Sequence, residues 1–501
     1  MYFGLFLKQF SINFKWLAWT VPILSSAFDP EITLTLQAVR NDRDLLHNIE
    51  ARKDALALAK IGFEAGVAED YELAADAYNR AVRVFSTWTS DWGIYRRALA
   101  CAHHAEALHN LGRLAEAEEA TAQAVKAGTD TKMAEGRIIA AKAVARLGAY
   151  LYLEGYKERR RNEGLMQMQR AARLLENAST SDALTQSAEI QFNLGVMYSQ
   201  LGDRGTEARR AYEQAMNDAR RAAVPAGITY GLKAAENLTN LSTEMTDGDA
   251  TVGALHTVID FCIASGTPAT LAEASRAASL LAARIDASED KEGYENALEQ
   301  ALQSGVEAGT DAAAEQACTA ARLLGNLYYE TDHARAASYY EQAIALAEGI
   351  DTPEAALEIN WSAVALGALH ANAGERDKAV ACFEKATEAG LHQGDGRGLA
   401  AAAEATFQHG NLLAESNSQE AASRYEKAET LGLRADTTEG LDTAAKAVLI
   451  YGDMLERLGR TEDCVPLYER ALEIARHQET ALSKQIVESA TAALENLAAK
   501  E

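Results

Sequence analysis

The sequence predicts an all-α fold, an α-solenoid of about ten helix–turn–helix repeats followed by a C-terminal capping helix. A small apolar position, nearly always alanine, recurs about every 42 to 44 residues, and a period of this length marks a repeat array. The 501 residues include only 6 prolines, and no stretch alternates apolar and polar residues as a half-buried strand would. The recurring positions are Ala81, Ala124, Ala171, Ala215, a blurred fifth near Val258, Ala301, Ala343, Ala386, Ala428 and Ala471.

The length of the chain is compatible with such an array. A chain of 501 residues is too long for one ordinary core, but each unit of a repeat array packs only on its neighbours. We expect residues 1–30 to form an N-terminal apolar tail or a signal segment, and residues 31–50 an N-terminal helix. The repeat array then covers residues 51–480, and residues 481–501 form the capping helix.

The last repeat shows the residue pattern most clearly. Gly452 lies in its first predicted helix, Gly459 ends that helix, and Cys464, Tyr468 and Ala471 follow at steps of four and three. Such steps share one helix face, and two helices approach closely only where one presents a small side chain. The small residues therefore admit the neighbouring helix, and the ring fills the gap between units. Further copies lie at Gly62, Ala74, Tyr78 and Ala81; at Gly195, Gly202, Ala208, Tyr212 and Ala215; at Gly325, Ala336, Tyr340 and Ala343; at Gly367, Gly374, Ala379, Phe383 and Ala386; and at Gly410, Ala421, Tyr425 and Ala428.

This pattern resembles the tetratricopeptide repeat family over about residues 51–478. The common repeat of that family has about 34 residues, so this chain is similar to the long-helix branch found in kinesin light chains and in bacterial regulators of the maltose-activator type. HEAT and armadillo repeats have a similar period but lack the glycine turn and the alanine–aromatic–alanine spacing. The resemblance implies a right-handed superhelix whose first helices, the A helices, line a concave groove.

The junctions between repeats carry helix stop and start signals. We expect the second helices, the B helices, to end in left-handed caps at Gly128, Gly266, Gly309 and Gly349. Thr or Asp residues that follow would cap the next A helix, with Pro268 and Pro353 at its first position. Pro466 is expected in or near the first turn of its helix.

Two repeats are irregular. The third has about four extra residues within 156–162, and the fifth loses most small-residue markers within 239–260. A weak fifth repeat would form a hinge in a nearest-neighbour array, whereas simple drift would leave it packed.

The charge of the chain restricts its partners. A formal net charge of −25 repels nucleic acids and anionic membranes. The segment Lys157–Arg161 is the densest basic run, and it is either a solvated turn or a docking point for an acidic partner segment.

The cysteines and the first residues bear on localisation. The five cysteines are single and odd in number, which favours buried thiols in a reducing compartment and hence a cytoplasmic protein. Against this, Lys8 and Lys15 precede an apolar run at 16–24 and a small-residue stretch at 25–27, as in a signal segment. Residues 1–28 are thus an export or membrane-anchoring signal, a tail or a misassigned start.

No motif points to catalysis. The sequence has no phosphate-binding loop, H-E-x-x-H or G-x-S-x-G, and the glycine-rich stretch 394–398 lies at a repeat junction. Cys101, His103, His104 and His109 share one helix but lack a second ligand pair, so we expect them to fill structure rather than bind metal. We predict no enzyme activity, no cofactor and no metal.

The resemblance places candidate binding residues at fixed steps from the small crossing residue of each A helix. Arrays that hold acidic chaperone tails use a clamp of Asn, Lys and Arg; Asn326 and Asn411 fit its first position, but Val364 and Ala365 stand where the second Asn would be needed, so that ligand is not predicted. The groove positions are Glu189, Phe192, Ser199, Lys233, Glu236, Asn240, Arg284, Arg322, Asn326, Tyr329, Trp361, Glu404, Phe407, Asn411, Lys446 and Asp453.

Three functions follow as hypotheses. The first is a non-enzymatic scaffold or adaptor that binds a peptide or protein in the concave groove. The second is an exported or envelope-associated assembly factor, and the third is a regulatory sensor for a signalling peptide or a small ligand.

Overall fold

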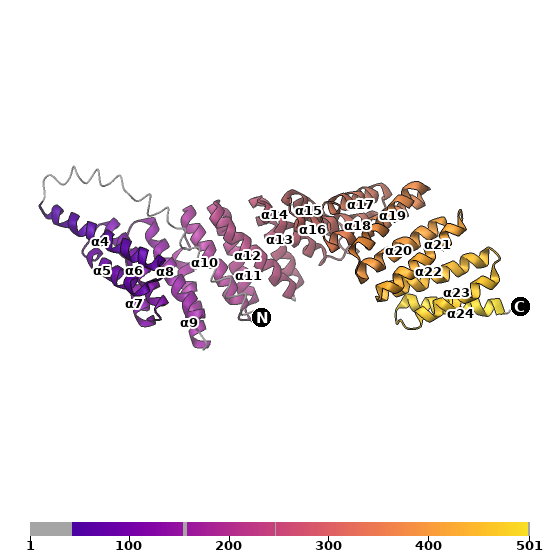
Figure 1. Ribbon diagram of the computed structural model, residues 1–501. Coiled ribbons are helices and arrows are strands. Elements are labelled where there is room, and N and C mark those ends of the chain that lie inside the picture. The colour runs from indigo at the N-terminus through magenta and orange to yellow at the C-terminus, as the bar shows by residue number, and fades with distance from the viewer. Residues whose placement is uncertain (1–42, 154–157, 246, 499–501) are drawn as a thin grey trace. The chain divides into compact units, whose positions relative to one another are not determined.

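The computed structural model describes residues 43–153, 158–245 and 247–498, and in these residues every regular element is a helix (Figure 1). The helices form ten successive pairs, each with an A helix and a B helix. The A helices are α4 (Arg43–Val67), α6 (Asp91–Asn110), α8 (Ala134–Leu153), α10 (Ser181–Ser199), α12 (Pro225–Glu244), α14 (Pro268–Ala282), α16 (Asp311–Tyr328), α18 (Pro353–Asn372), α20 (Gly396–Leu413) and α22 (Thr438–Arg457). The B helices are α5 (Tyr71–Phe85), α7 (Leu114–Asp130), α9 (Glu158–Leu174), α11 (Gly205–Ala222), α13 (Gly248–Ser265), α15 (Lys291–Ala308), α17 (His333–Ala347), α19 (Arg376–Gln393), α21 (Ser418–Ala435) and α23 (Thr461–Ala475), and α24 (Ala481–Ala498) follows them.

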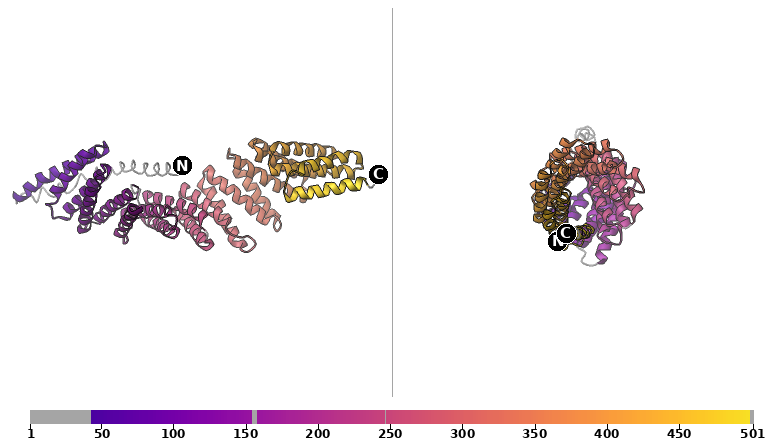
Figure 2. Two further views of the ribbon diagram at one scale, coloured as in Figure 1. Left: turned by 90° about the horizontal axis from the view of Figure 1, so that it is seen from below. Right: turned by 90° about the vertical axis from the view of Figure 1, so that its right-hand side faces the viewer.

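The described residues belong to two compact units, which divide between Ala234 and Ala235 inside α12. Helices that follow each other in sequence pack together from α4 to α11 and from α13 to α24; Figure 2 shows this for the orange and yellow helices of the C-terminal unit. Consecutive A helices also contact each other directly, as α6, α8 and α10 do in the N-terminal unit and α14 to α22 do in the C-terminal unit. Each unit therefore presents a continuous surface of A helices, which we call the A-helix face. The predicted α-solenoid is confirmed.

The recurring alanines lie at the closest contacts. All ten positions of the predicted period, including Val258, have an exposed fraction of 0%. Because alanine has no side chain beyond Cβ, helices on either side can approach closely at these points. The period seen in the sequence is thus the period of the core.

Each aromatic ring of the pattern lies on the glycine of its own A helix. A β-carbon added at Gly195 would be 2.3 Å from Tyr212, and one at Gly452 would be 2.8 Å from Tyr468. The rings also reach the next A helix, since Tyr425 stacks on Tyr451 with 6.0 Å between ring centroids. The prediction that the ring fills the space between neighbouring units is therefore confirmed.

Several of the predicted caps are present. Gly266 and Gly309 end α13 and α15 in the left-handed region, with φ of 62° and 65°. Thr267 then accepts a bond from the amide of Thr270, and Pro268 occupies the first position of α14. Thr352 and Pro353 repeat this arrangement at α18.

Two expectations at the junctions are wrong. Gly128 does not end α7, which continues to Asp130; instead it is buried against Gly136 of α8. Gly349 has no positive φ, because α17 already ends at Ala347. Pro466 lies near the first turn of α23, as expected, at the start of the second turn and on an exposed side where water can satisfy the carbonyl group that loses its helical donor.

The close approach of Gly128 to the next repeat belongs to a contact that the sequence analysis missed. Near the end of several B helices a glycine meets a small residue eight positions later, at the start of the next A helix. A β-carbon at Gly390 would lie 2.6 Å from the carbonyl oxygen of Gly398, and one at Gly432 would lie 2.3 Å from that of Gly440. Neighbouring repeats therefore touch through their main chains.

The chain ends are described only in part. Residues 1–42, which contain the expected tail or signal and most of the expected N-terminal helix, lie outside the described residues, as does Lys157. Helix α4 begins at Arg43 and continues through the expected boundary at residue 50. At the other end, α24 buries Ile486, Ala490 and Leu497. Among the described residues, no helix has both the length and the apolarity needed to cross a bilayer.

Candidate binding surface on the A helices

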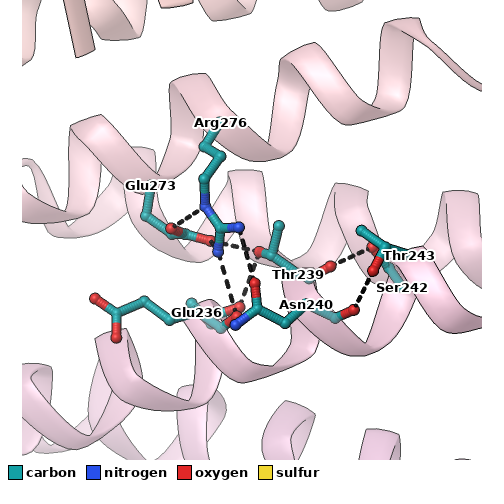
Figure 3. Close-up of polar contacts among 8 residues, drawn as sticks. Glu236, Thr239, Asn240, Ser242, Thr243, Glu273 and Arg276 are labelled. Carbon is teal, nitrogen blue, oxygen red and sulfur yellow. Dashed lines mark hydrogen bonds and ion pairs between the residues drawn. The ribbon is translucent and has the colours of Figure 1, made fainter. Parts of the chain in front are cut away.

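At the start of the C-terminal unit, Arg276 of α14 joins two A helices (Figure 3). Its guanidinium donates to both carboxylate oxygens of Glu273, at 2.8 and 2.9 Å, and to the side-chain oxygen of Asn240 on α12, at 2.9 Å. It also donates to the main-chain carbonyl of Glu236, at 3.3 Å, while the carboxylate of Glu273 accepts from the hydroxyl of Thr239. The candidate residue Asn240 is thus part of an interhelical network, and the Glu236 side chain is exposed.

The candidate residue Arg284 lies two residues beyond the C-terminal end of α14 at Ala282. It is exposed, and it donates to the main-chain carbonyls of Ser242 and Thr243 at 3.4 and 3.5 Å. Figure 3 shows these two acceptor residues at the end of α12.

The next two repeats place Trp361 beside a fixed arginine. Arg322 of α16 donates to Glu358 of α18, with 2.6 Å from Nε to the nearer carboxylate oxygen, and its guanidinium lies 5.0 Å from the centre of the Trp361 ring. Glu358 also accepts from Thr319, at 3.0 Å. The arginine is only 18% exposed and its partner 7%, whereas Trp361 is 41% exposed. A tryptophan held on a paired arginine is a preformed contact surface.

The asparagines Asn326 and Asn411 have the same role in their repeats. Each follows the crossing glycine and accepts a hydrogen bond from the tyrosine of its own B helix, Tyr340 at 2.7 Å and Tyr425 at 3.0 Å. Burial raises the pKa of both tyrosines to about 12, so each hydroxyl stays protonated and donates. Both asparagine side chains remain exposed. Each amide can still offer its NH₂ group and the second lone pair of its oxygen to a partner, although one N–H of Asn411 already donates to Gln408 at 3.3 Å.

Two candidate aromatics do not present their rings to a partner. Phe407 is 2% exposed and lies between Tyr425 and Lys446, whose ammonium is 4.5 Å from the ring centre. Phe192 is 7% exposed and packs on Tyr212. Both phenylalanines lie three residues before the crossing glycine, where the ring packs on the tyrosine of its own B helix. Tyr329 is half-buried at the C-terminal cap of α16.

The polar groups of the ninth and tenth repeats pair with each other. Glu404 of α20 lies 3.8 Å from Lys446 of α22, and it accepts from Gln408 at 2.7 Å. Further along α22, the carboxylates of Asp453 and Glu456 share the one hydroxyl proton of Tyr468 on α23, whose oxygen lies 2.9 Å from Asp453 and 3.1 Å from Glu456.

In the N-terminal unit the A-helix face centres on Glu106 of α6. This carboxylate pairs with Arg146 of α8 and lies 3.4 Å from Nδ1 of His103. Burial alone would raise the pKa of Glu106, but Arg146 and His103 outweigh it and lower the pKa to about 2. Burial lowers the pKa of the nearby His109 to about 4, and that ring stacks on Tyr150.

Glu189, the candidate residue of α10, accepts from Gln186 at 2.9 Å.

The sequence analysis missed the buried carboxylates Glu273 and Glu358 and the half-buried Glu106, each paired with an arginine of its own or a neighbouring A helix. In a chain with 73 acidic residues, nothing in the local sequence separates these three from solvated carboxylates. Their pairing depends on which helices are neighbours.

The basic run Lys157–Arg161 is only partly described. Arg160 lies 3.9 Å from Glu118, with both side chains about half exposed.

Comparisons with known proteins agree with the repeat pattern. Residues 362–389 and 445–478 match the sequence model of the tetratricopeptide repeat. No curated protein is significantly similar to the chain in sequence.

Three solved structures illustrate the structural matches. A signal transduction ATPase with numerous domains and a tetratricopeptide repeat sensor, from Pyrococcus horikoshii, is 14% identical with a TM-score of 0.40; the match covers 74% of this chain and 55% of that one. Yeast Tom70 is 12% identical over 89% of this chain and 96% of its own, with a TM-score of 0.30. The Cut9–Hcn1 hetero-tetramer of the APC/C is 12% identical over 91% and 98%, with a TM-score of 0.35.

Proposed function

We propose that this chain, which matches the tetratricopeptide repeat model over residues 362–389 and 445–478, is a non-enzymatic scaffold or adaptor that binds a peptide or protein on its A-helix face. The observation that carries the proposal is the exposure of Trp361. The other large apolar side chains exposed among the described residues are aliphatic, whereas this one is a tryptophan on the A-helix face. Tryptophan and arginine are the usual anchors of protein interfaces.

The surroundings of Trp361 support a binding role. Its neighbour Arg322 is already oriented by Glu358, so a partner that covers the ring does not have to order the arginine. Pre-ordering of this kind lowers the entropic cost of association.

The test is affinity capture from the native lysate with the full chain as bait. We expect Trp361→Ala to reduce the captured partner at least about tenfold, as for an interface anchor. The matched control is Val306→Ala, which removes an apolar side chain of similar exposure from a B helix. Equal capture by wild type and Trp361→Ala, with loss in Val306→Ala, would place binding on the B helices and overturn the proposal.

A further inference from the structure

We propose, resting on the function above, that the A-helix face of α18, α20 and α22 binds an extended polypeptide with two anchors: a bulky uncharged apolar side chain at Trp361, and a lysine or arginine at Asp453 and Glu456. All the residues involved belong to the C-terminal unit.

The first anchor follows from the surface of α18. Trp361, Val364, Ala365 and Ala368 follow each other at helical steps of three and four, and all are partly or fully exposed. Because Ala365 and Ala368 are small, the ring of Trp361 protrudes from the helix surface next to them. An apolar partner side chain can therefore cover the ring and the alanines together.

The charges around this surface exclude a charged first anchor. Arg322 on one side is paired with Glu358 at 2.6 Å, and Glu404 on the other side is near Lys446 at 3.8 Å. A charged partner side chain would lose its hydration and find no free counter-charge. An uncharged apolar side chain does not have this desolvation cost.

The second anchor follows from a hollow beside α22. It has a volume of about 620 Å³ and is lined by Ile450, Asp453, Glu456 and Arg457. The two carboxylates outnumber the one guanidinium, which donates to the main-chain carbonyl of Asp453 at 3.3 Å. The Tyr468 hydroxyl binds both carboxylates and holds the two like charges close together.

This hollow suits a long basic side chain. A cationic end group offsets the repulsion between Asp453 and Glu456, and the aliphatic stem of Lys or Arg can lie on Ile450. The net charge of −25 further favours a basic partner through long-range attraction.

The distance between the anchors sets the spacing in the partner. From α18 to α22 there are two steps between adjacent A helices, and packed helix axes lie about 8–10 Å apart. Trp361 lies six residues before its crossing glycine and Asp453 one residue after its own, which adds an offset of about 10 Å along the helix axes. The anchors are then about 21 Å apart, and an extended chain that rises about 3.3 Å per residue covers this distance in about six residues.

The experiment measures binding of fluorescent peptides to the full chain by polarisation. The peptides carry one phenylalanine and one arginine in a Gly/Ser background, separated by one to fourteen residues, and a matched set has glutamate in place of arginine. We expect the tightest binding at a separation of about six residues, at least about tenfold weaker binding for the glutamate set, and a loss of affinity as salt rises.

Variants assign each anchor. Trp361→Ala should weaken binding of every peptide, whereas Asp453→Asn, which can still accept from Tyr468, should weaken only the arginine peptides. Asp377→Asn, an exposed carboxylate of the B helix α19, is the control and should change nothing.

Three results would overturn the inference: equal affinity for the arginine and glutamate sets, no dependence on spacing, or no binding of any peptide. A maximum at about fourteen residues would mean a helical partner and would also overturn it. If these results came while Trp361→Ala still abolished capture from lysate, the proposed function would stand and only this partner chemistry would fail.

Discussion

The ring of Tyr340 lies against the α-carbon of Gly325, so that a β-carbon at this glycine would be only 2.5 Å from Cε1 of the tyrosine. We predict that Gly325→Ala lowers the free energy of unfolding by roughly 1–3 kcal/mol, because the ring has to move away from a well-packed position. Urea denaturation followed by circular dichroism measures the effect.

The control for this variant is Gly253→Ala. Gly253 lies exposed in α13 with no atom within 4 Å of an added β-carbon, so alanine there should leave stability unchanged or raise it by up to about 1 kcal/mol. Similar effects of the two substitutions would show that the ring contact does not determine stability.

The buried pair Arg322 and Glu358 gives a second prediction. Glu358→Gln leaves a largely buried guanidinium without its counter-charge and should destabilise the C-terminal unit by roughly 2–4 kcal/mol. The exposed carboxylate Glu473 pairs with Arg470 at the surface, and Glu473→Gln should have no measurable effect; thermal melts of the two variants measure the difference. A neutral result for Glu358→Gln would mean that the pair contributes no net stability.

The cap of α14 gives a third prediction. Thr267 accepts from the amide of Thr270 and forms a reciprocal capping box with it, so Thr267→Ala should cost about 1 kcal/mol. Thr257 is a partly exposed threonine in the middle of α13, and Thr257→Ala should stay within about 0.5 kcal/mol of wild type. Equal effects in denaturant titrations would argue against the cap.

The pH dependence of the N-terminal unit gives a fourth prediction. Burial lowers the pKa of His109 from 6.5 to about 4, so the unfolded chain binds one more proton than the folded chain between these pH values. Stability should therefore fall as the pH is lowered through this window, by on the order of 3 kcal/mol, since one pKa unit corresponds to about 1.4 kcal/mol. Glu106, Arg146 and Tyr150 face the ring.

Thermal melts of wild type and His109→Phe between pH 7 and pH 4 test this. The phenylalanine cannot take up a proton, so its melting temperature should change less over the window. At lower pH, Glu106 should add a separate loss as the pH falls from about 4.5 towards 2, because its folded pKa is depressed. Parallel curves for the two proteins would show that His109 does not couple to folding.

The repeat architecture was predictable because it depends on residues with few structural options. Where two helices approach closely, there is room only for an alanine or for a glycine beneath an aromatic ring. These close contacts recur once in every repeat, so residues such as Ala301 and Gly410 mark the period in the sequence. The prediction failed where a glycine can have either of two roles. Gly128 was expected to end α7, but it lies inside this helix, where the lack of a side chain lets the main chain of Gly136 approach.

The binding surface was predictable only in part. The repeat numbering places both Trp361 and Phe407 among the predicted groove positions, and Trp361 is exposed in the structure. Phe407 lies three residues before its crossing glycine, whereas Trp361 lies six before its own, and the ring of Phe407 is buried between Tyr425 and Lys446. The carboxylate of Glu358 was missed because its partner lies 36 residues away on another helix.

The glycine contacts between repeats have a consequence for engineering this protein. Because the backbone of α19 rests directly on the backbone of α20 at Gly390 and Gly398, the separation of these helices does not depend on the side chains they display. Repeats could therefore be shuffled or duplicated at boundaries placed just before such a glycine contact, provided that both glycines are kept. New binding surfaces can then be assembled without redesigning the contacts between repeats.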